Sequence, residues 1–170
     1  MAKTVLYFWM SSMLLLCACQ SDLDLTEAEV YTILNEIIVA DSLRIHRLCW
    51  KFKNLPLYGE YAKVFTEQDK TLIKQQKLLH KGFIIQPNKL KGYSSGRKSF
   101  HLVEVDSTCD KGIIDHLSFP LISIDRQKLV IEITEDCNCL LGGKGGKMLY
   151  EKINGQWKLS KTFDWWISER

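Results

Sequence analysis

The chain has 170 residues, 25% of them charged, and a formal net charge of +3 at pH 7. This length predicts one domain that can bury a sizeable core without depending on disulfides. The charge is nearly balanced, and the one basic stretch contains few aromatic residues, which argues against a nucleic-acid-binding module. We therefore expect a single folded domain and no nucleic-acid partner.

The first residues form a targeting segment. Lys3 supplies a positive charge, and residues 5–16 are mostly apolar. This run is too short for a membrane-spanning helix, which needs about 20 apolar residues. The segment Leu16-Cys17-Ala18-Cys19 follows. It resembles the lipobox of bacterial lipoproteins, in which a Leu stands three places before the modified Cys and a small residue directly before it.

The lipobox resemblance implies that residues 1–18 are a signal peptide and that Cys19 is the acylated first residue of the mature protein. Gln20, not an Asp, follows this Cys. By resemblance to enteric lipoproteins, this implies the outer membrane, facing the periplasm or the cell surface. An ordinary secretory signal cleaved after Ala18 is the alternative. We expect residues 19–25 to be a tether and residues 26–170 to be one α+β domain.

The first predicted helix begins after Thr26. Thr26 and Glu29 form the pattern of a capping box, in which each residue satisfies a backbone N–H of the other. Apolar residues at helical spacing extend this helix over residues 27–48, and a break near Asp41-Ser42 is the alternative.

A second helix is predicted after Thr66, with Asp69 in the capping-box position and Gly82 as a natural stop. Its inner stripe comprises Leu72, Ile73, Gln76 and Leu79.

Strands are predicted in the second half of the chain. Alternation of apolar and polar residues predicts strands over residues 101–106, 117–124 and 128–136. Pro120 indicates an edge or a bulge within the second of these, because proline cannot donate to a ladder. Residues 88–98 are predicted to form a flexible loop.

The final hairpin has the strongest local signal. Asn154-Gly155 fits a type I′ turn, which needs positive φ at both central residues. In the resulting register Glu151 faces Lys158. Alternate positions of the last strand predict one buried apolar face, broken only by Lys161. This face comprises Trp157, Leu159, Phe163, Trp165 and Ile167.

The order of these elements predicts an α+β fold, with N-terminal helices packed on one face of a C-terminal antiparallel β-meander. The C-terminal half also resembles a group of uncharacterised Bacteroidota lipoproteins. That resemblance brings no known activity with it. It rests on Cys137-x-Cys139, Gly142-Gly143, Lys152, Gly155-x-Trp157 and Trp166-Ile167-Ser168.

The glycine-rich segment 142–147 superficially resembles a phosphate-binding loop. A P-loop requires G-x-x-x-x-G-K-[ST] between a strand and a helix. Here the spacing from Gly142 to Gly146 is one residue short, and Met148 occupies the hydroxyl position. We therefore interpret the segment as a glycine-rich connection between two strands.

Four cysteines follow Cys19, an even number that suits disulfides in an exported protein: Cys49, Cys109, Cys137 and Cys139. Cys137 and Cys139 point the same way in an extended strand, so we expect at least one of them to bond to a distant partner, Cys109 or Cys49. A zinc site would need Cys-x₂₋₄-Cys and a second ligand pair. We expect no metal and no cofactor.

Two stretches carry further candidate chemistry. His46-x-x-Cys49 could place an imidazole beside a thiol, as a thiolate nucleophile requires. The basic stretch from Lys70 to Lys98 contains no acidic residue. It is either a solvated surface or a site for an anionic or protein partner.

These observations predict a lipid-anchored cell-envelope protein whose domain binds a ligand without catalysing a reaction. The alternatives are an inhibitor or immunity-type lipoprotein that caps a partner protein, and a thiol- or His-dependent envelope hydrolase.

Overall fold

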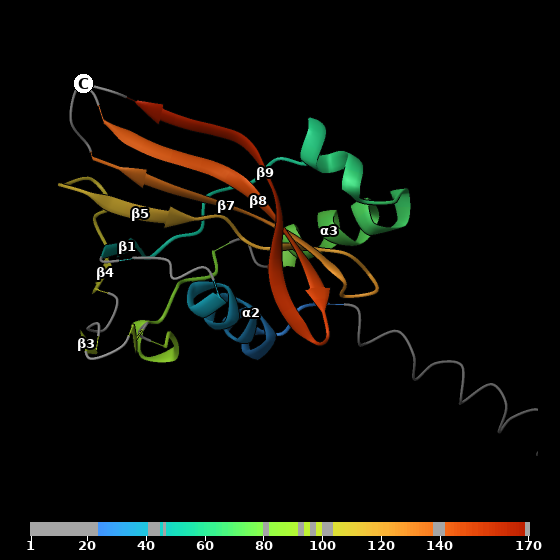
Figure 1. Cartoon of the computed structure of the whole chain (residues 1–170), viewed down its shortest axis with the longest axis horizontal. Coiled ribbons are helices and arrows are strands. Elements are labelled where there is room, and N and C mark those ends of the chain that lie inside the picture. Colours follow the sequence, from blue (N-terminus) through green and yellow to red (C-terminus); the bar gives the residue numbers. More distant parts are fainter. Residues whose placement is uncertain are drawn as a thin grey trace, which may run out of the picture.

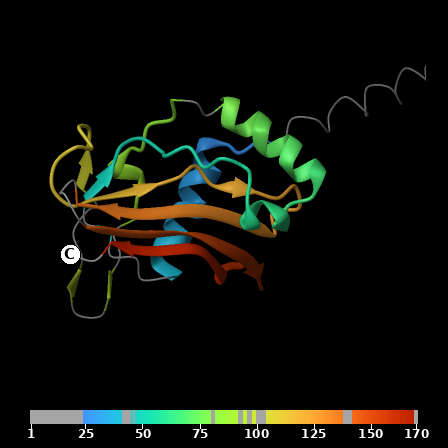
Figure 2. The same cartoon turned by 90° about the horizontal axis from the view of Figure 1, so that it is seen from above.

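The computed structural model describes residues 24–40, 45, 47–79, 82–91, 94–95, 98–99, 104–137 and 142–168. Within them, a seven-stranded sheet has the order β4-β1-β5-β7-β8-β9, with β6 pairing to β7 outside this path (Figures 1 and 2). Its strands are β1 (Arg47–Cys49), β4 (Glu104–Asp106), β5 (Ile114–Leu117), β6 (Leu121–Ile122), β7 (Lys128–Asp136), β8 (Gly143–Ile153) and β9 (Gln156–Ser168). The α-helices are α2 (Glu27–Ala40) and α3 (Glu67–Leu79), and η2 (Glu60–Val64) is a 3₁₀ helix.

The sheet is mixed. Strands β7, β8 and β9 form the predicted antiparallel meander. Strand β1, however, runs parallel to both β4 and β5. The α+β class is confirmed, but a purely antiparallel sheet is wrong.

The register of the last hairpin is confirmed. Asn154 and Gly155 have φ angles of 52° and 80°, as the type I′ turn requires. Glu151 faces Lys158, and Lys152 faces Trp157 with its Nζ 5.3 Å from the ring centroid. The turn residues therefore set the pairing of the two longest strands from Ile153 as far as Tyr150.

The single apolar face predicted for β9 is wrong. The β8–β9 register shifts between Leu149 and Tyr150 and again between Gly145 and Lys147. Each β-bulge adds one residue to β9 and reverses which side chains face inward. Trp157 and Phe163 are both buried, but they belong to separate cores on opposite faces of the sheet.

Both capping boxes are confirmed. The Glu29 carboxylate accepts hydrogen bonds from the Thr26 backbone N–H and hydroxyl, both at 2.8 Å. Asp69 accepts the corresponding bonds from Thr66 and also the Ile124 N–H at 2.7 Å, which ties α3 to the turn before β7. Burial raises the pKa of Asp69, but these hydrogen bonds outweigh it and hold the pKa below its ordinary value.

The first helix is shorter than predicted. It ends at Ala40, and the expected helical residues Arg47 and Leu48 belong to β1. Leu48 is buried in the strand, and the predicted helix would also turn it toward the core. Apolar spacing alone therefore could not distinguish the last turn of a helix from a short central strand.

The two helices cover opposite faces of the sheet, not one face as predicted (Figure 2). Alternate residues of β7 and β8 point to the two sides and divide the core in two. The core on the α2 side includes Val30, Leu34, Ile37, Leu129, Ile131, Tyr150 and Trp157. The core on the α3 side includes Leu55, Tyr61, Phe65, Ile73, Leu121, Val130, Leu149 and Phe163.

The remaining predicted strands differ in outcome. Strand β7 matches the prediction at both ends. The strand predicted over 117–124 is interrupted around Pro120, where β5 ends and β6 begins. The loop predicted over 88–98 contains the end of the 3₁₀ helix η3 (Pro87–Lys89) and a separate two-stranded pair, β2 (Ser94–Ser95) and β3 (Lys98–Ser99). Residues 101–103 of the predicted strand lie outside the described residues.

The glycine-rich segment is not a connection between strands. Gly143 to Gly146 form the first part of β8. All four residues pair with β7, and the first three also pair with β9. The absence of side chains here allows close packing, because a Cβ on Gly145 would lie 2.6 Å from the Thr134 Cγ2 atom.

Candidate ligand-binding groove between α2 and β9

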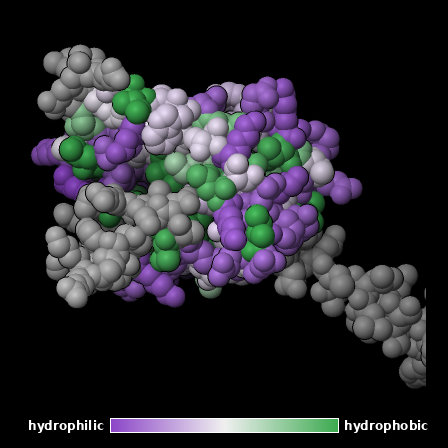
Figure 3. All heavy atoms as spheres, in the orientation of Figure 1, coloured by the Kyte–Doolittle hydropathy of each residue, from purple (hydrophilic) through white to green (hydrophobic). Residues whose placement is uncertain are grey.

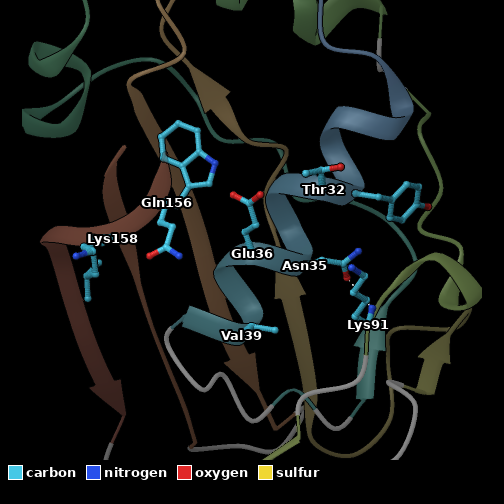
Figure 4. A pocket seen from close by; sticks show the side chains of 10 residues that line it. Thr32, Asn35, Glu36, Val39, Lys91, Gln156 and Lys158 are labelled. Atoms are coloured by element: carbon cyan, nitrogen blue, oxygen red, sulfur yellow. Dashed lines mark hydrogen bonds between the residues drawn. The ribbon is translucent and has the colours of Figure 1, made fainter. Parts of the chain in front are cut away.

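A groove of about 850 Å³ lies between α2 and the start of β9 (Figure 4). Pockets of this size hold small molecules or short segments of polymer. The groove is lined by Tyr31, Thr32, Asn35, Glu36, Val39, Lys91, Gln156, Trp157, Lys158 and Leu159. On the face of the molecule drawn in Figure 3, hydrophobic surface forms separate patches among hydrophilic residues.

One wall is held in place by side chains of α2. Asn35 donates to the Lys89 carbonyl at 3.0 Å and accepts the Lys91 N–H at 2.6 Å. The Tyr31 hydroxyl accepts the Gln86 N–H at 2.6 Å. These groups fix the segment that precedes Lys91, so they shape the groove and leave little hydrogen-bonding capacity for a ligand.

Glu36 is the charged group that α2 presents to the groove (Figure 4). It is exposed, and no described residue forms an ion pair or hydrogen bond with its carboxylate. Val39, one turn further along α2, is 51% exposed, and Leu159 on β9 is 44% exposed. The groove therefore combines an unpaired carboxylate with apolar side chains from both walls.

A smaller cavity of about 150 Å³ shares Thr32, Glu36 and Trp157 with this groove. Glu29 lines it beside Arg126, and their charged groups are 3.8 Å apart. Burial raises the pKa of Glu29, but the hydrogen bonds from Thr26 and the charge of Arg126 hold it below its ordinary value. Glu29, in the first turn of α2, is therefore engaged by Thr26 and Arg126, whereas Glu36 has no such partner among the described residues.

A second polar cluster lies on the α3 side of the sheet. Lys53 donates to Thr134 Oγ1 and Asp136 Oδ2, both at 2.8 Å, and His116 Nε2 lies 3.3 Å from the same carboxylate oxygen. Burial lowers the pKa of His116, and so does the nearby Lys53 ammonium, while Asp136 opposes them. These groups form hydrogen bonds and ion pairs with one another, and none of them lines either of the cavities described above. We therefore interpret the cluster as structural.

The disulfides differ from those predicted. Cys49 bonds to Cys109, with their Cα atoms 5.1 Å apart. Cys137 is also disulfide-bonded, and its partner is not among the described residues. The expected bridge from Cys137 or Cys139 to Cys109 or Cys49 is therefore wrong. Because Cys49 is oxidised, it cannot be the thiolate nucleophile of a hydrolase with His46, which itself lies outside the described residues, as do Cys19 and Cys139.

The basic stretch is divided between two sides of the sheet. Lys70 on α3 pairs with Glu67, and Lys89 pairs with Glu27 on α2. Of the residues described in this stretch, Lys91 alone lines the groove. The described lysines thus form no single basic surface, although the interaction of individual lysines with an anionic partner stays a prediction.

No pattern in the sequence predicted the groove. Glu36 and Val39 stand at ordinary solvent-facing positions of an amphipathic helix, and the start of β9 follows a turn. Only their approach in three dimensions makes them a site.

The described residues contain no group of three or more His, Cys, Asp or Glu side chains that could hold a metal ion. Among the same residues, no helix has the length and apolar character needed to cross a membrane. No protein-family model, curated protein or solved structure matches the chain.

Proposed function

We propose that the chain is a lipid-anchored protein of the cell envelope whose domain binds a ligand in the groove between α2 and β9 without turning it over. The groove is the observation that supports binding, because it presents exposed apolar side chains and an unpaired carboxylate on two rigid elements. The anchor is supported by Leu16-Cys17-Ala18-Cys19, and Gln20 favours the outer membrane.

The anchor is tested by fractionating cells that express the wild type or Cys19→Ser. We expect wild-type protein in the membrane fraction, with a lipid-modified Cys19 found by mass spectrometry. Cys19→Ser should release the domain or leave the precursor uncleaved. An unmodified, soluble protein that begins at Cys19 would contradict the anchor.

The groove is tested by placing a photo-crosslinking amino acid at Val39 in the native cells. A matched control carries the same amino acid at Gln68, an exposed position of α3 on the other side of the sheet. We expect an adduct of defined mass from position 39 and none from position 68. Equal labelling at both positions, or none at position 39, would contradict binding in the groove. A protein adduct of fixed mass would favour a partner-capping function over binding of a small molecule.

A further inference from the structure

The groove lies along the backbone edge of β9, not only beside one face of it. Gln156, Trp157, Lys158 and Leu159 are consecutive and all line the groove. Successive side chains of a strand point to opposite faces, so a cavity that touches all four must run along the strand itself. Strand β9 ends the order of the described sheet and has no neighbour on its outer side.

The register identifies the backbone groups that face this edge. In a two-residue hairpin the residues flanking the turn, Ile153 and Gln156, form the hydrogen-bonded pair. The pattern alternates, so Trp157 and Leu159 form non-hydrogen-bonded pairs with β8 and direct their N–H and C=O groups outward. No described residue accepts from or donates to these outward groups. The edge is regular as far as Leu159, after which the first bulge follows.

Helix α2 completes a site for an added strand. It crosses the face of the sheet and its C-terminal end approaches β9 (Figure 2). A strand added outside β9 would turn alternate side chains toward Glu36 and Val39. Side chains at i and i+2 of an extended chain are about 6.6 Å apart, a separation that matches two positions one turn apart on a helix.

We infer that the groove binds an extended segment of a partner polypeptide, which adds to the sheet as a strand beside Trp157 and Leu159. Main-chain hydrogen bonds to an exposed edge supply affinity in this mode of recognition, and pockets for alternate side chains supply specificity. The groove is also lined by Lys91 and Lys158, so it is the Glu36 carboxylate and the apolar side chains near it, not the overall charge of the groove, that define the segment. It carries a Lys or Arg that pairs with the Glu36 carboxylate and, two residues away, an apolar side chain that packs between Val39 and Leu159. This inference rests on the proposed binding function of the groove.

The test uses detergent-solubilised full-length protein and a display library of random heptapeptides. We expect enriched peptides to carry an apolar and a basic residue two positions apart. Val39→Asp should weaken binding of an enriched peptide about tenfold or more, equivalent to about 1.4 kcal/mol. Glu36→Gln should weaken it roughly three- to tenfold, because an ion pair at a partly exposed site contributes modestly. Glu67→Gln on α3 is the matched control and should leave binding unchanged, since Glu67 pairs only with Lys70 on the other side of the sheet.

Strand addition itself is tested on the backbone. Hydrogen exchange at the amides of Trp157 and Leu159 should slow when the peptide binds. Methylation of a peptide nitrogen that pairs with Trp157 or Leu159 should weaken or abolish binding, while methylation of the next nitrogen along the peptide, which points away from the edge, should not.

Four outcomes would overturn the inference: no enrichment of the apolar-x-basic pattern, unchanged affinity in Val39→Asp, unchanged amide exchange, or equal effects of both methylations. A dimer of the chain that Val39→Asp dissociates would assign the edge to a second copy and would also overturn it. If position 39 cross-links a non-peptide ligand in cells and peptides do not bind, the inference fails and the proposed function stands. If position 39 cross-links nothing, both fail.

Discussion

The ring of Trp165 lies on the backbone of Gly146, where an added Cβ atom would come within 2.9 Å of the ring's Cε3 atom. The adjacent Trp166 lies in the same way against Gly143, whose Cβ would be 3.2 Å from its Cη2 atom. Consecutive side chains of a strand point to opposite faces. The glycines of β8 therefore let two indole rings from β9 pack closely on both sides of one strand.

Gly146→Ala should lower the free energy of unfolding by about 1–3 kcal/mol, because the added methyl group overpacks against a ring that the strand holds in place. Urea denaturation at constant pH measures this difference. The double variant Gly146→Ala/Trp165→Ala is the control. Removing the indole removes the closest of the contacts that the methyl group would make, so the cost of Gly146→Ala should fall in the Trp165→Ala background. Equal costs in both backgrounds would show that Trp165 is not the cause.

Features encoded by a few neighbouring residues were predictable from the sequence. The two capping boxes and the Asn154-Gly155 turn depend only on residues within one turn, and all three have the expected contacts. The bulges in β9 were not predictable, because an extra residue leaves no mark on the alternation of apolar positions. One such bulge was enough to move Phe163 to the face opposite Trp157.

Pairings distant in sequence could not be predicted either. Strand β1 is a three-residue segment whose parallel neighbours come from much later in the chain. The partner of Cys49 follows from that arrangement, since β1 and β4 bring Cys49 next to Asp106 and thus close to Cys109. The groove likewise depends on α2 reaching the edge of β9, which no local pattern encodes.

The double variant Cys49→Ala/Cys109→Ala should lose about 2–4 kcal/mol of stability, because the bond closes a loop between cysteines 60 positions apart and restricts the unfolded chain. Chemical denaturation without reductant measures the loss and leaves the bond at Cys137 intact. Dithiothreitol should destabilise the wild type at least as much. A double variant as stable as the wild type, or a peptide map with Cys49 and Cys109 unlinked, would contradict this bond.

His116 should make stability depend on pH between neutral and mildly acidic conditions. Its folded pKa lies below the ordinary value of 6.5, because burial and Lys53 disfavour the charged ring. The unfolded chain therefore binds the proton more readily than the folded chain. The folded protein has its full stability with respect to this group above about pH 6.5 and loses stability as the pH drops toward the folded pKa of His116. Denaturation midpoints at pH 7.5 and 5.5 should show this fall in the wild type and a smaller one in His116→Gln. The pKa values of the Glu29 and Asp69 carboxyl groups are also lowered on folding, so these groups lose their contributions to stability only at a lower pH. An identical pH dependence in the two proteins would show that His116 does not titrate differently on folding.

The last prediction compares two tryptophans of β9 that the sequence pattern treats as equivalent. Trp157 is 3% exposed and packs in the core beneath α2, whereas Trp165 is 51% exposed and lies within the second bulge, opposite Gly146. Trp157→Ala should therefore cost about 3–5 kcal/mol, the range for removing a buried aromatic side chain. Trp165→Ala removes a half-exposed ring that lies on a glycine, so its cost should be smaller, about 1–2 kcal/mol by the apolar area that it still buries.

Urea denaturation of both variants, followed by far-ultraviolet circular dichroism, gives the two free energies without relying on tryptophan fluorescence. The difference in burial predicts the order of the costs, with Trp157→Ala the larger by at least about 1 kcal/mol. An unbroken strand with one apolar face would instead bury both rings and give similar costs. Equal losses would therefore contradict the difference in burial between Trp157 and Trp165.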